Sequence, residues 1–449
     1  MPLNNHRGEV NVPSIVTGRD NWISGKIGDF ASVKHGYAFK GSQFTDVDTR
    51  RVVLTPRNFN IGGGFRSEKL KFTIQDCPEE YILHGGDIIV SMTDLSKDGD
   101  TLGYSAKVPS NRKYKYLHNQ RIGLIKFKES KVLPDYIYWV MRTREFNSFL
   151  VGSATGSTVK HTSPSIIEEF PFCYPPNRNE QRLISDTLSN LDSKIELNQE
   201  MNKTLESIAH ALFKHWFIDF EFPDENGNPY KSSGGEMVES ELGEIPKGWK
   251  ISKIGNELST VLGGTPSTNK KEYWSNGNFG WINSGKVNEF RIIEPSSYIT
   301  ETALNNSATK LMPKGTTVLA ITGATLGRVS MIESEMCANQ SVIGVLSNEK
   351  ISSEYIYFWI KFYINKLISG QTGGAQQHIN KENVNSLELL VPKNSLEKFN
   401  KTCGPIFNQI SNNCFESLTL SKVRDVLLPK LMSGKIRVTL EEINDKKNE

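Results

Sequence analysis

The sequence has few cysteines and no long apolar segment, and these two absences exclude several classes of protein. None of the cysteines forms a C-x-x-C pair; they are Cys77, Cys173, Cys337, Cys403 and Cys414. This usage argues against a disulfide framework or a zinc site and favours a reducing cytoplasm. No apolar run approaches the roughly 18 residues of a membrane span, and the start, MPLNNHRGEVNVPS, lacks the apolar segment of a secretory signal. We therefore expect a cytoplasmic protein that has no membrane partner.

Motifs for catalysis and cofactor binding are also missing. There is no G-x-x-x-x-G-K-[ST] loop, so an ATPase is not expected. The histidines are scattered without the spacing of metal ligands. Asn228-Pro229-Tyr230 resembles part of the N-P-P-Y motif of adenine methyltransferases, but it lacks the second proline and stands in a turn-rich stretch. We predict that the chain is not an enzyme and that it binds no metal and no cofactor.

The charge of the chain is unevenly distributed. At 449 residues the chain is too long for one compact core, and its net charge is only +3. Residues 22–175 contain 21 Lys and Arg against 16 Asp and Glu, and residues 246–393 contain 15 against 11. If the protein binds an anion, we expect these two basic blocks to bind it.

The sequence repeats itself with a period of about 220 residues. Five pairs of segments keep the same order: WISGKIGDFASV from Trp22 with WKISKIGNELSTV from Trp249, GDIIVSMT from Gly86 with GTTVLAIT from Gly315, Asn119-Gln120 with Asn339-Gln340, DYIYWV from Asp135 with EYIYFW from Glu354, and GSATGS from Gly152 with GQTGGA from Gly370. The period is too long for a solenoid, so the chain contains two copies of a module made of a domain and a helix.

Each copy ends in a helix-start signal that is followed by a heptad pattern. The signal P-x-N-x-x-E occurs at residues 175–180 and 392–397, and it predicts helices capped by Asn177 and Asn394. Apolar residues then recur in steps of four and three: Ile184, Leu188, Leu191, Ile195, Leu205 and Leu212 in the first helix, and Ile406, Ile410, Leu420 and Leu427 in the second. A stretch of about 40 residues with this spacing favours a coiled coil about 60 Å long. The alternative is two ordinary amphipathic helices, each packed on its own domain.

Two features of the helices bear on their pairing and their partners. Asn198 and Asn202 interrupt the first apolar stripe and Asn413 interrupts the second, so we expect them to pair across the seam and fix its register. The region of Trp216, Phe217 and Phe220 and the end of the second helix suit docking surfaces for a partner, or equally a seal between the coiled coil and the domains.

With these motifs in place, the sequence resembles the specificity subunits of Type I restriction-modification systems over residues 22–438. The segments that carry the resemblance are IPKGWKISKIG from Ile245, GGTPST from Gly263, Tyr273-Trp274, GWI from Gly280, AITGATLG from Ala320, LFKHWFIDFEFP from Leu212 and LLPKLMSGKIRV from Leu427. The resemblance implies an α+β protein with two mixed α/β target-recognition domains, two long helices in an antiparallel coiled coil and a pseudo-twofold internal repeat. It implies three kinds of partner: double-stranded DNA, two adenine-methyltransferase subunits and a restriction subunit that translocates and cleaves DNA.

We divide the chain accordingly into seven segments. They are an N-terminal lead (1–21), a first target-recognition domain (22–176), a first long helix (177–221), a linker (222–245), a second target-recognition domain (246–393), a second long helix (394–434) and a C-terminal tail (435–449). The first domain departs from the family pattern, because GYAFKGSQF from Gly36 replaces a GGTPS-like loop.

DNA binding of this kind uses Lys and Arg on phosphates and polar side chains on base edges. The predicted contacts in the first domain are Lys40, Arg57, Asn58, Thr93, Lys97, Lys160 and His161. Those in the second domain are Thr265, Ser267, Asn283, Lys286, Thr322, Arg328, Gln376, Gln377 and His378. For any single residue the alternative is a solvated loop position or a turn former.

The function predicted from the sequence is that of a DNA specificity subunit that reads an asymmetric bipartite site and positions two methyltransferase subunits and a restriction subunit. Two alternatives are a coiled-coil scaffold that carries two ligand-binding domains and does not bind DNA, and the specificity subunit of a related system that fuses restriction with methylation. Filter binding separates the scaffold from the others, because a DNA reader loses affinity steeply as salt rises.

Overall fold

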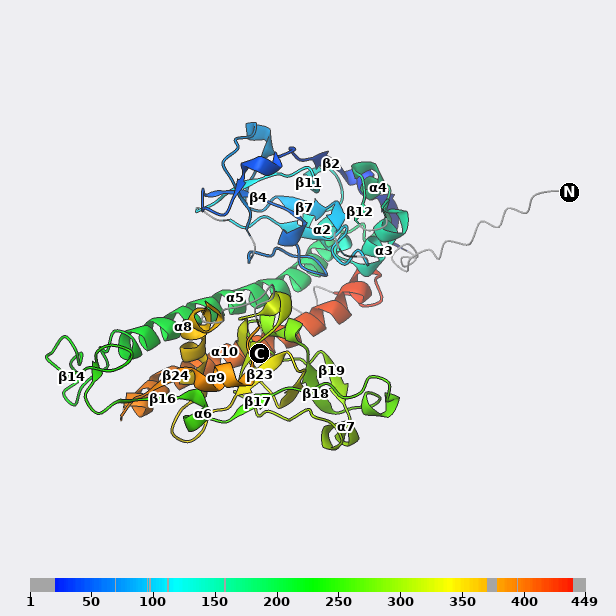
Figure 1. The fold of residues 1–449 in the computed structure, drawn as a ribbon. Coiled ribbons are helices and arrows are strands. Elements are labelled where there is room, and N and C mark those ends of the chain that lie inside the picture. The colour runs from blue at the N-terminus through cyan, green and yellow to red at the C-terminus, as the bar shows by residue number, and fades with distance from the viewer. Residues whose placement is uncertain are drawn as a thin grey trace, which may run out of the picture. The chain divides into compact units, whose positions relative to one another are not determined.

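The computed structural model describes residues 21–68, 70–94, 96, 98–110, 113–156, 159–369, 378–393 and 395–438. The chain forms two compact units. Unit 1 consists of the residues up to Ser193 and those from Leu420 onward, and unit 2 is Lys194–Thr419. Two long helices, α5 (Arg178–Phe217) and α10 (Ser395–Met432), contribute residues to both units (Figure 1). Mixed helix and strand content with two long helices confirms the predicted fold class.

Unit 1 is a mixed α/β domain. Its strands are β1 (Ile23–Lys26), β2 (Ala31–His35), β3 (Phe44–Thr45), β4 (Arg51–Val53), β5 (Phe72–Thr73), β6 (Ile82–Leu83), β7 (Ile88–Ser91), β8 (Thr93–Asp94), β9 (Ser105–Lys107), β10 (Lys115–Leu117), β11 (Ile122–Phe127), β12 (Lys160–His161) and β13 (Pro171–Tyr174). Its α-helices are α1 (Ile27–Phe30), α2 (Pro134–Val140), α3 (Arg144–Ser153) and α4 (Pro164–Glu168), and its 3₁₀ helices are η1 (Gly41–Gln43), η2 (Pro56–Asn58) and η3 (Glu79–Tyr81).

Unit 2 is built in the same way. Its strands are β14 (Met237–Val238), β15 (Ile245–Pro246), β16 (Lys250–Lys253), β17 (Thr260–Leu262), β18 (Phe279–Ile282), β19 (Ser297–Ile299), β20 (Thr317–Ala320), β21 (Val329–Met331), β22 (Met336–Ala338), β23 (Val342–Val345) and β24 (Glu388–Val391). Its α-helices are α6 (Ile254–Glu257), α7 (Glu301–Asn305), α8 (Ser353–Ser369) and α9 (Lys381–Ser386), and its 3₁₀ helices are η4 (Lys271–Tyr273), η5 (Ser284–Asn288) and η6 (Gly323–Thr325).

The sheets of the two units repeat one topology. Four strands in the order β2-β11-β7-β9 form the central sheet of unit 1, and β17-β23-β20-β21 form that of unit 2. A second sheet in each unit contains one parallel pair, β4 with β10 and β18 with β22. An antiparallel ribbon, β1–β13 or β16–β24, leads from each domain to its long helix. The internal repeat in the sequence is thus a repeat of the fold.

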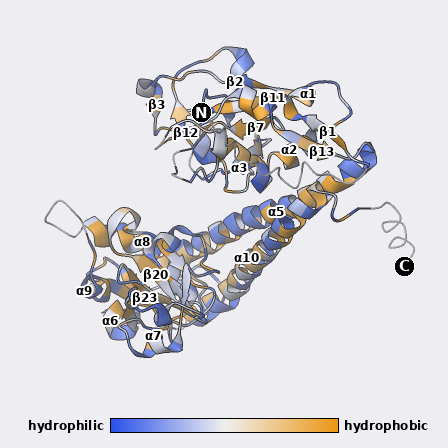
Figure 2. Ribbon diagram, turned by 90° about the vertical axis from the view of Figure 1, so that its right-hand side faces the viewer, coloured by the Kyte–Doolittle hydropathy of each residue, from blue (hydrophilic) through white to orange (hydrophobic). Residues whose placement is uncertain are grey.

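Within each unit α5 and α10 lie side by side (Figure 2). The predicted seam residues are all shielded from solvent: Ile184, Leu188, Ile195 and Ile410 are buried, and Leu191, Leu205, Leu212, Ile406, Leu420 and Leu427 are half-buried. In unit 2 the helices run antiparallel, because residues later in α5 contact residues earlier in α10. The spacing of four and three in the sequence therefore corresponds to the contact face of the pair.

The three asparagines expected to pair across the seam do so in unit 2. The Asn413 amide donates to Asn202 Oδ1 at 2.9 Å. The Asn198 amide donates to Ser417 Oγ at 3.3 Å and to Glu416 Oε2 at 2.8 Å. Asn198, Asn202 and Asn413 are all buried. Because a one-heptad slip would leave these amides without partners, the network favours one register.

A buried arginine fastens each domain to a long helix. In unit 1 Arg142 forms an ion pair with Asp192 of α5, and Arg424 of α10 approaches the same carboxylate at 2.6 Å. The Arg142 guanidinium also stacks on Trp139, 4.4 Å from the ring centre, and donates to the Gly62 carbonyl at 2.9 Å. A single carboxylate on α5 thus connects the domain, its 60–65 loop and α10.

In unit 2 a different set of residues attaches the domain to a long helix. Arg291 stacks on Tyr357 and Phe407 and lies 3.4 Å from Glu333 Oε1. Glu333 Oε2 accepts a hydrogen bond of 2.8 Å from Ser411 of α10. Nothing in the sequence pattern indicated the ion pairs of Arg142 and Arg291, because the residues that they join are distant in the chain.

The aromatic end of α5 seals the helix against the domain of unit 2. Trp216 and Phe217 are 8% and 1% exposed. Phe217 packs edge to face on Tyr355 and Phe399, with ring centres 4.8 and 5.0 Å apart. The docking surface considered for these two side chains is therefore wrong, and the alternative of a seal is what the structure contains.

The helix caps follow the sequence in part. Asn177 Oδ1 accepts a hydrogen bond of 2.8 Å from the backbone N–H of Asn179, as a capping residue does. Glu180 lies 3.8 Å from Arg437, where an ion pair takes the place of the reciprocal half of the capping box. The predicted cap Asn394 lies outside the described residues.

We predict that Asn413→Ala lowers the free energy of unfolding by roughly 1–3 kcal/mol, because it leaves the buried Asn202 oxygen without its donor. Asn408→Ala is the matched control, since Asn408 is on the same helix and is exposed. Urea denaturation of the full chain measures both. Equal unfolding free energies for the two variants would show that the network does not stabilise the pair.

Candidate nucleic-acid interface

In unit 2 the ends of three strands meet at one edge of the fold. Strands β17, β18 and β20 all end beside the β22–β23 turn, residues 339–341. The backbone hydrogen bonds that join them run from Gly264 N–H to Ala338 O (2.8 Å), from Asn339 N–H to Ile282 O (2.9 Å) and from Ile321 N–H to Ser341 O (3.0 Å). The loops that leave these strands therefore surround the turn.

Unit 1 has the same edge. Strands β2, β4 and β7 end beside the β10–β11 turn, residues 119–121. The bonds from Tyr37 N–H to His118 O (2.8 Å) and from Met92 N–H to Arg121 O (3.0 Å) are equivalent to the first and third bonds of unit 2. A further bond from Leu54 N–H to Leu117 O (3.0 Å) joins the end of β4 to β10. The repeat thus extends to individual backbone hydrogen bonds.

In each unit the backbone of one glycine lies in close contact with the turn at residues 119–121 or 339–341. A Cβ on Gly263 would lie 2.1 Å from the Asn339 carbonyl oxygen, and one on Gly36 would lie 2.2 Å from that of Asn119. No side chain fits at those distances, so both positions require glycine. Although GYAFK and GGTPS differ in sequence, they share the residue on which the contact depends.

Two indole groups hold the 263–268 loop of unit 2. Trp281 Nε1 donates to the Gly264 carbonyl at 3.1 Å, and Trp274 Nε1 donates to the Ser267 carbonyl at 3.2 Å. The two rings pack edge to face, 5.2 Å apart. The loop is therefore a fixed surface on which Thr265 and Ser267 are exposed.

The structure gathers the described DNA-contact candidates of unit 2 at this edge. They lie on the loops that follow β17, β18 and β20 and on the segment before α9: Thr265, Ser267, Asn283, Lys286, Thr322, Arg328 and His378. Arg328, Asn283 and His378 are exposed. Lys286 is half-buried and pairs with Glu289 at 2.8 Å. Gln376 and Gln377 lie outside the described residues.

In unit 1 the candidates Lys40, Arg57 and His161 are exposed and Lys160 is half-buried, each on the segment equivalent to one in unit 2. Two others have no accessible group. Asn58 is fully buried, and its side chain accepts from the Thr55 N–H at 2.9 Å and donates to the Arg66 carbonyl. Thr93 is 3% exposed and bonds His161 Nδ1 at 3.1 Å. Both residues serve the fold, which corrects their prediction as DNA contacts; Lys97 lies outside the described residues.

Two titratable groups support the edge of unit 1. Burial lowers the pKa of His118 to about 4, so the ring is neutral near pH 7 and Nε2 donates to the Ile122 carbonyl at 2.7 Å. Burial acts to raise the pKa of Asp94, but hydrogen bonds from the N–H groups of Ser96 and Thr101 hold it below its usual value. Asp94 therefore stays ionised and shapes the loop after β8.

The residues at the centre of each edge were not among the candidates. Gln120 and Gln340 are exposed in the two turns. In each turn the preceding asparagine side chain accepts from the N–H two residues on, Asn119 from Arg121 at 3.0 Å and Asn339 from Ser341 at 3.1 Å. The recurrence of Asn-Gln at equivalent places in the repeat was the signal that could have singled them out.

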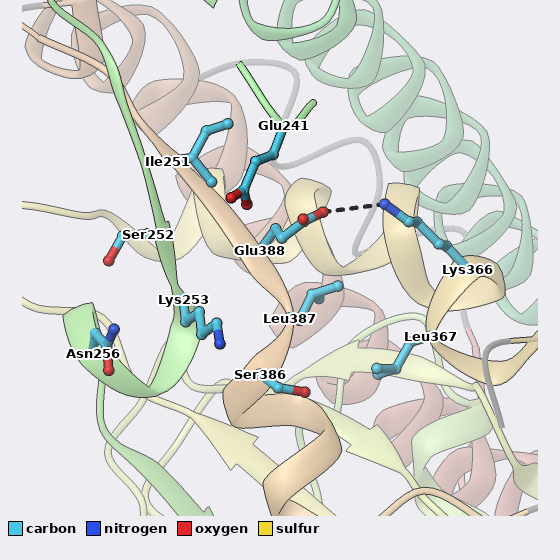
Figure 3. A pocket seen from close by; sticks show the side chains of 10 residues that line it. All are labelled: Glu241, Ile251, Ser252, Lys253, Asn256, Lys366, Leu367, Ser386, Leu387 and Glu388. Atoms are coloured by element: carbon cyan, nitrogen blue, oxygen red, sulfur yellow. Dashed lines mark hydrogen bonds and ion pairs between the residues drawn. The ribbon is translucent and has the colours of Figure 1, made fainter. Parts of the chain in front are cut away.

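Elsewhere in unit 2 a cleft of about 690 Å³ lies between the β16–β24 ribbon and the end of α8 (Figure 3). Its charged lining balances, with Glu241 and Glu388 against Lys253 and Lys366, and Lys366 pairs with Glu388 at 3.1 Å. The described residues contain no group of three His, Cys, Asp or Glu side chains placed to hold a metal ion. No helix within the described ranges is both long and apolar enough to cross a membrane.

Comparison with known proteins identifies relatives over most of the chain. The family described as Type I restriction modification DNA specificity domain matches residues 19–207 and 246–422. The Type I restriction enzyme MjaIX specificity subunit of Methanocaldococcus jannaschii is 28% identical over 312 residues, which cover 68% of this chain and 70% of that protein. The HindI specificity subunit of Haemophilus influenzae is 25% identical over 463 residues, covering 85% of this chain and 99% of that protein.

A solved structure has the same fold. The crystal structure of a Type-I restriction-modification system S subunit from M. genitalium matches with a TM-score of 0.55 and 15% sequence identity. The match covers 93% of this chain and 98% of that one.

We predict that Gly36→Ala lowers the free energy of unfolding by roughly 1–3 kcal/mol, because its Cβ must push the loop away from the Asn119 carbonyl. Gly41→Ala is the control, since a Cβ there meets no atom within 4 Å. Urea denaturation of both full-length variants tests this. If Gly36→Ala is as stable as Gly41→Ala, the glycine does not hold the loop on the turn.

Proposed function

This chain belongs to the family of Type I restriction modification DNA specificity domains, and we propose that it reads a bipartite DNA site, one half-site with each unit. In this proposal it contributes binding and the partner subunits contribute catalysis. Two adenine-methyltransferase subunits and a restriction subunit assemble with it on double-stranded DNA.

The observation that carries the proposal is the duplicated edge. Each unit has a turn at residues 119–121 or 339–341, surrounded by polar loops on a rigid sheet. Loops held by a rigid scaffold are suited to reading base edges. The two edges share one backbone arrangement but carry different side chains, so they are suited to two different half-sites.

The duplication also supports the proposed number of methyltransferase partners. Each unit contains one domain and one stretch of paired α5 and α10 helix, so each can offer a similar face to the same partner. Relatives of this chain are named as specificity subunits of Type I restriction enzymes. We infer that one methyltransferase subunit docks on each unit.

A map of methylated bases in the genomic DNA of the source cells tests the function. We expect that deletion of the gene removes one bipartite adenine-methylation motif, and that the wild-type gene restores it. An unchanged map, in cells that express the partner methyltransferase, would reject the proposal in favour of a scaffold that does not bind DNA.

The length of the unread spacer between the half-sites should follow the helices. We predict that one heptad inserted after Ser193 in α5, with another before Leu420 in α10, lengthens the spacer by about 3 base pairs. Seven residues add about 10 Å at 1.5 Å per residue, and base pairs are about 3.4 Å apart. These positions leave the buried network of Asn198, Asn202 and Asn413 intact.

The readout is the methylation motif of the variant complex, with unchanged half-sites as the internal control. The original spacer length in a folded, active variant would mean that the helices do not set the distance.

A further inference from the structure

The turn between β22 and β23 displays one amide side chain at the centre of the unit 2 edge. Asn339 shapes the turn with its side chain, and Ser341 bonds Ile321 through its carbonyl. Gln340 lies between them, and its side chain is exposed. Its position is therefore fixed by the backbone, while its side chain is not needed for the turn.

The Gln340 side chain is also held in orientation. Thr265 Oγ1 donates to Gln340 Oε1 at 2.5 Å. Thr265 belongs to the loop that the Trp281 and Trp274 indoles fix through its carbonyls. An amide on a rigid base, with one oxygen lone pair and two N–H groups free to face outward, loses little entropy on binding.

Unit 1 places Gln120 at the equivalent point, between Asn119 and Arg121. Ala38 stands where unit 2 has Thr265, so that position offers no hydroxyl to the Gln120 amide. Arg121 stands where unit 2 has Ser341, and its side chain is exposed. The two turns therefore share the amide and differ in its neighbours.

We propose that Gln340 and Gln120 contact base edges, each in the half-site that its own unit reads. This inference rests on the proposed function. A glutamine amide matches the N6 and N7 groups of adenine through two hydrogen bonds, and an arginine matches O6 and N7 of guanine. Gln340 thus specifies adenine in one half-site, and the Gln120–Arg121 turn reads two neighbouring positions in the other.

The test uses the complete complex of this chain with its methyltransferase partner, acting on unmethylated bacterial DNA whose methylated positions are then mapped. We expect Gln340→Ala to lower discrimination at one base pair of one half-site by about 10- to 100-fold, with the other half-site unchanged. Gln120→Ala should relax one base pair of the opposite half-site.

Two further variants separate base reading from structure. Gln199→Ala removes an exposed amide from α5 and should leave the motif unchanged. Thr265→Val removes the anchor of Gln340 and should weaken discrimination at the same base pair, by less than Gln340→Ala does.

The outcomes are distinguishable. If the wild-type complex methylates no defined motif, the proposed function itself fails. If the wild-type complex has a motif and both Gln340→Ala and Gln120→Ala keep it with the same discrimination, the function stands and the inference about these glutamines is overturned.

Discussion

The close contact between a glycine and the carbonyl of the Asn–Gln turn is the constraint on which each edge depends. At Gly36 and at Gly263 the loop backbone lies where any side chain would displace the Asn119 or Asn339 carbonyl. This contact brings the first loop of each domain beside the turn, and backbone bonds bring the other loops to the same place. Because the scaffold holds the backbone, the exposed side chains can differ between the units without loss of the fold.

The long helices depend on a second kind of constraint, which is buried polarity. Apolar residues along α5 and α10 favour pairing, but they would tolerate a slip by one heptad. The pairing of Asn413 with Asn202, and the carboxylate of Asp192 between Arg142 and Arg424, each require specific partners. Burial makes an unpaired amide or charge costly. The register of the pair and the attachment of each domain to its helices therefore follow from a few polar contacts.

Much of this architecture could be predicted from the sequence, because it rests on local patterns. The heptad spacing predicted the two long helices, and the ordered repeat predicted the two domains. The interruption at Asn198, Asn202 and Asn413 indicated their pairing. Long-range contacts left no such pattern. The ion pairs of Arg142 and Arg291 join residues far apart in the chain. The burial of Asn58 depends on hydrogen bonds with Thr55 and Arg66, which only the folded chain brings around it.

The loops of the candidate site could be predicted from the sequence, but the residues at the centre of these loops could not. The described candidates of unit 2 lie together because strand ends meet at one edge, and their contact with DNA stays a prediction. Gln120 and Gln340 were overlooked because, in the sequence, each is one polar residue in a short turn. Only the fold places them at the centre of the loops, and only the repeat reveals that the same amide occupies both centres.

Hydrogen–deuterium exchange on the assembled complex, with its methylated target duplex and with a scrambled duplex, tests most directly the claim that both units bind DNA through this edge. The account predicts that the target duplex selectively slows exchange in residues 36–41 and 119–121 of unit 1 and 263–268 and 339–341 of unit 2. Slowed exchange confined to other faces of the units, with these four segments unchanged, would contradict it.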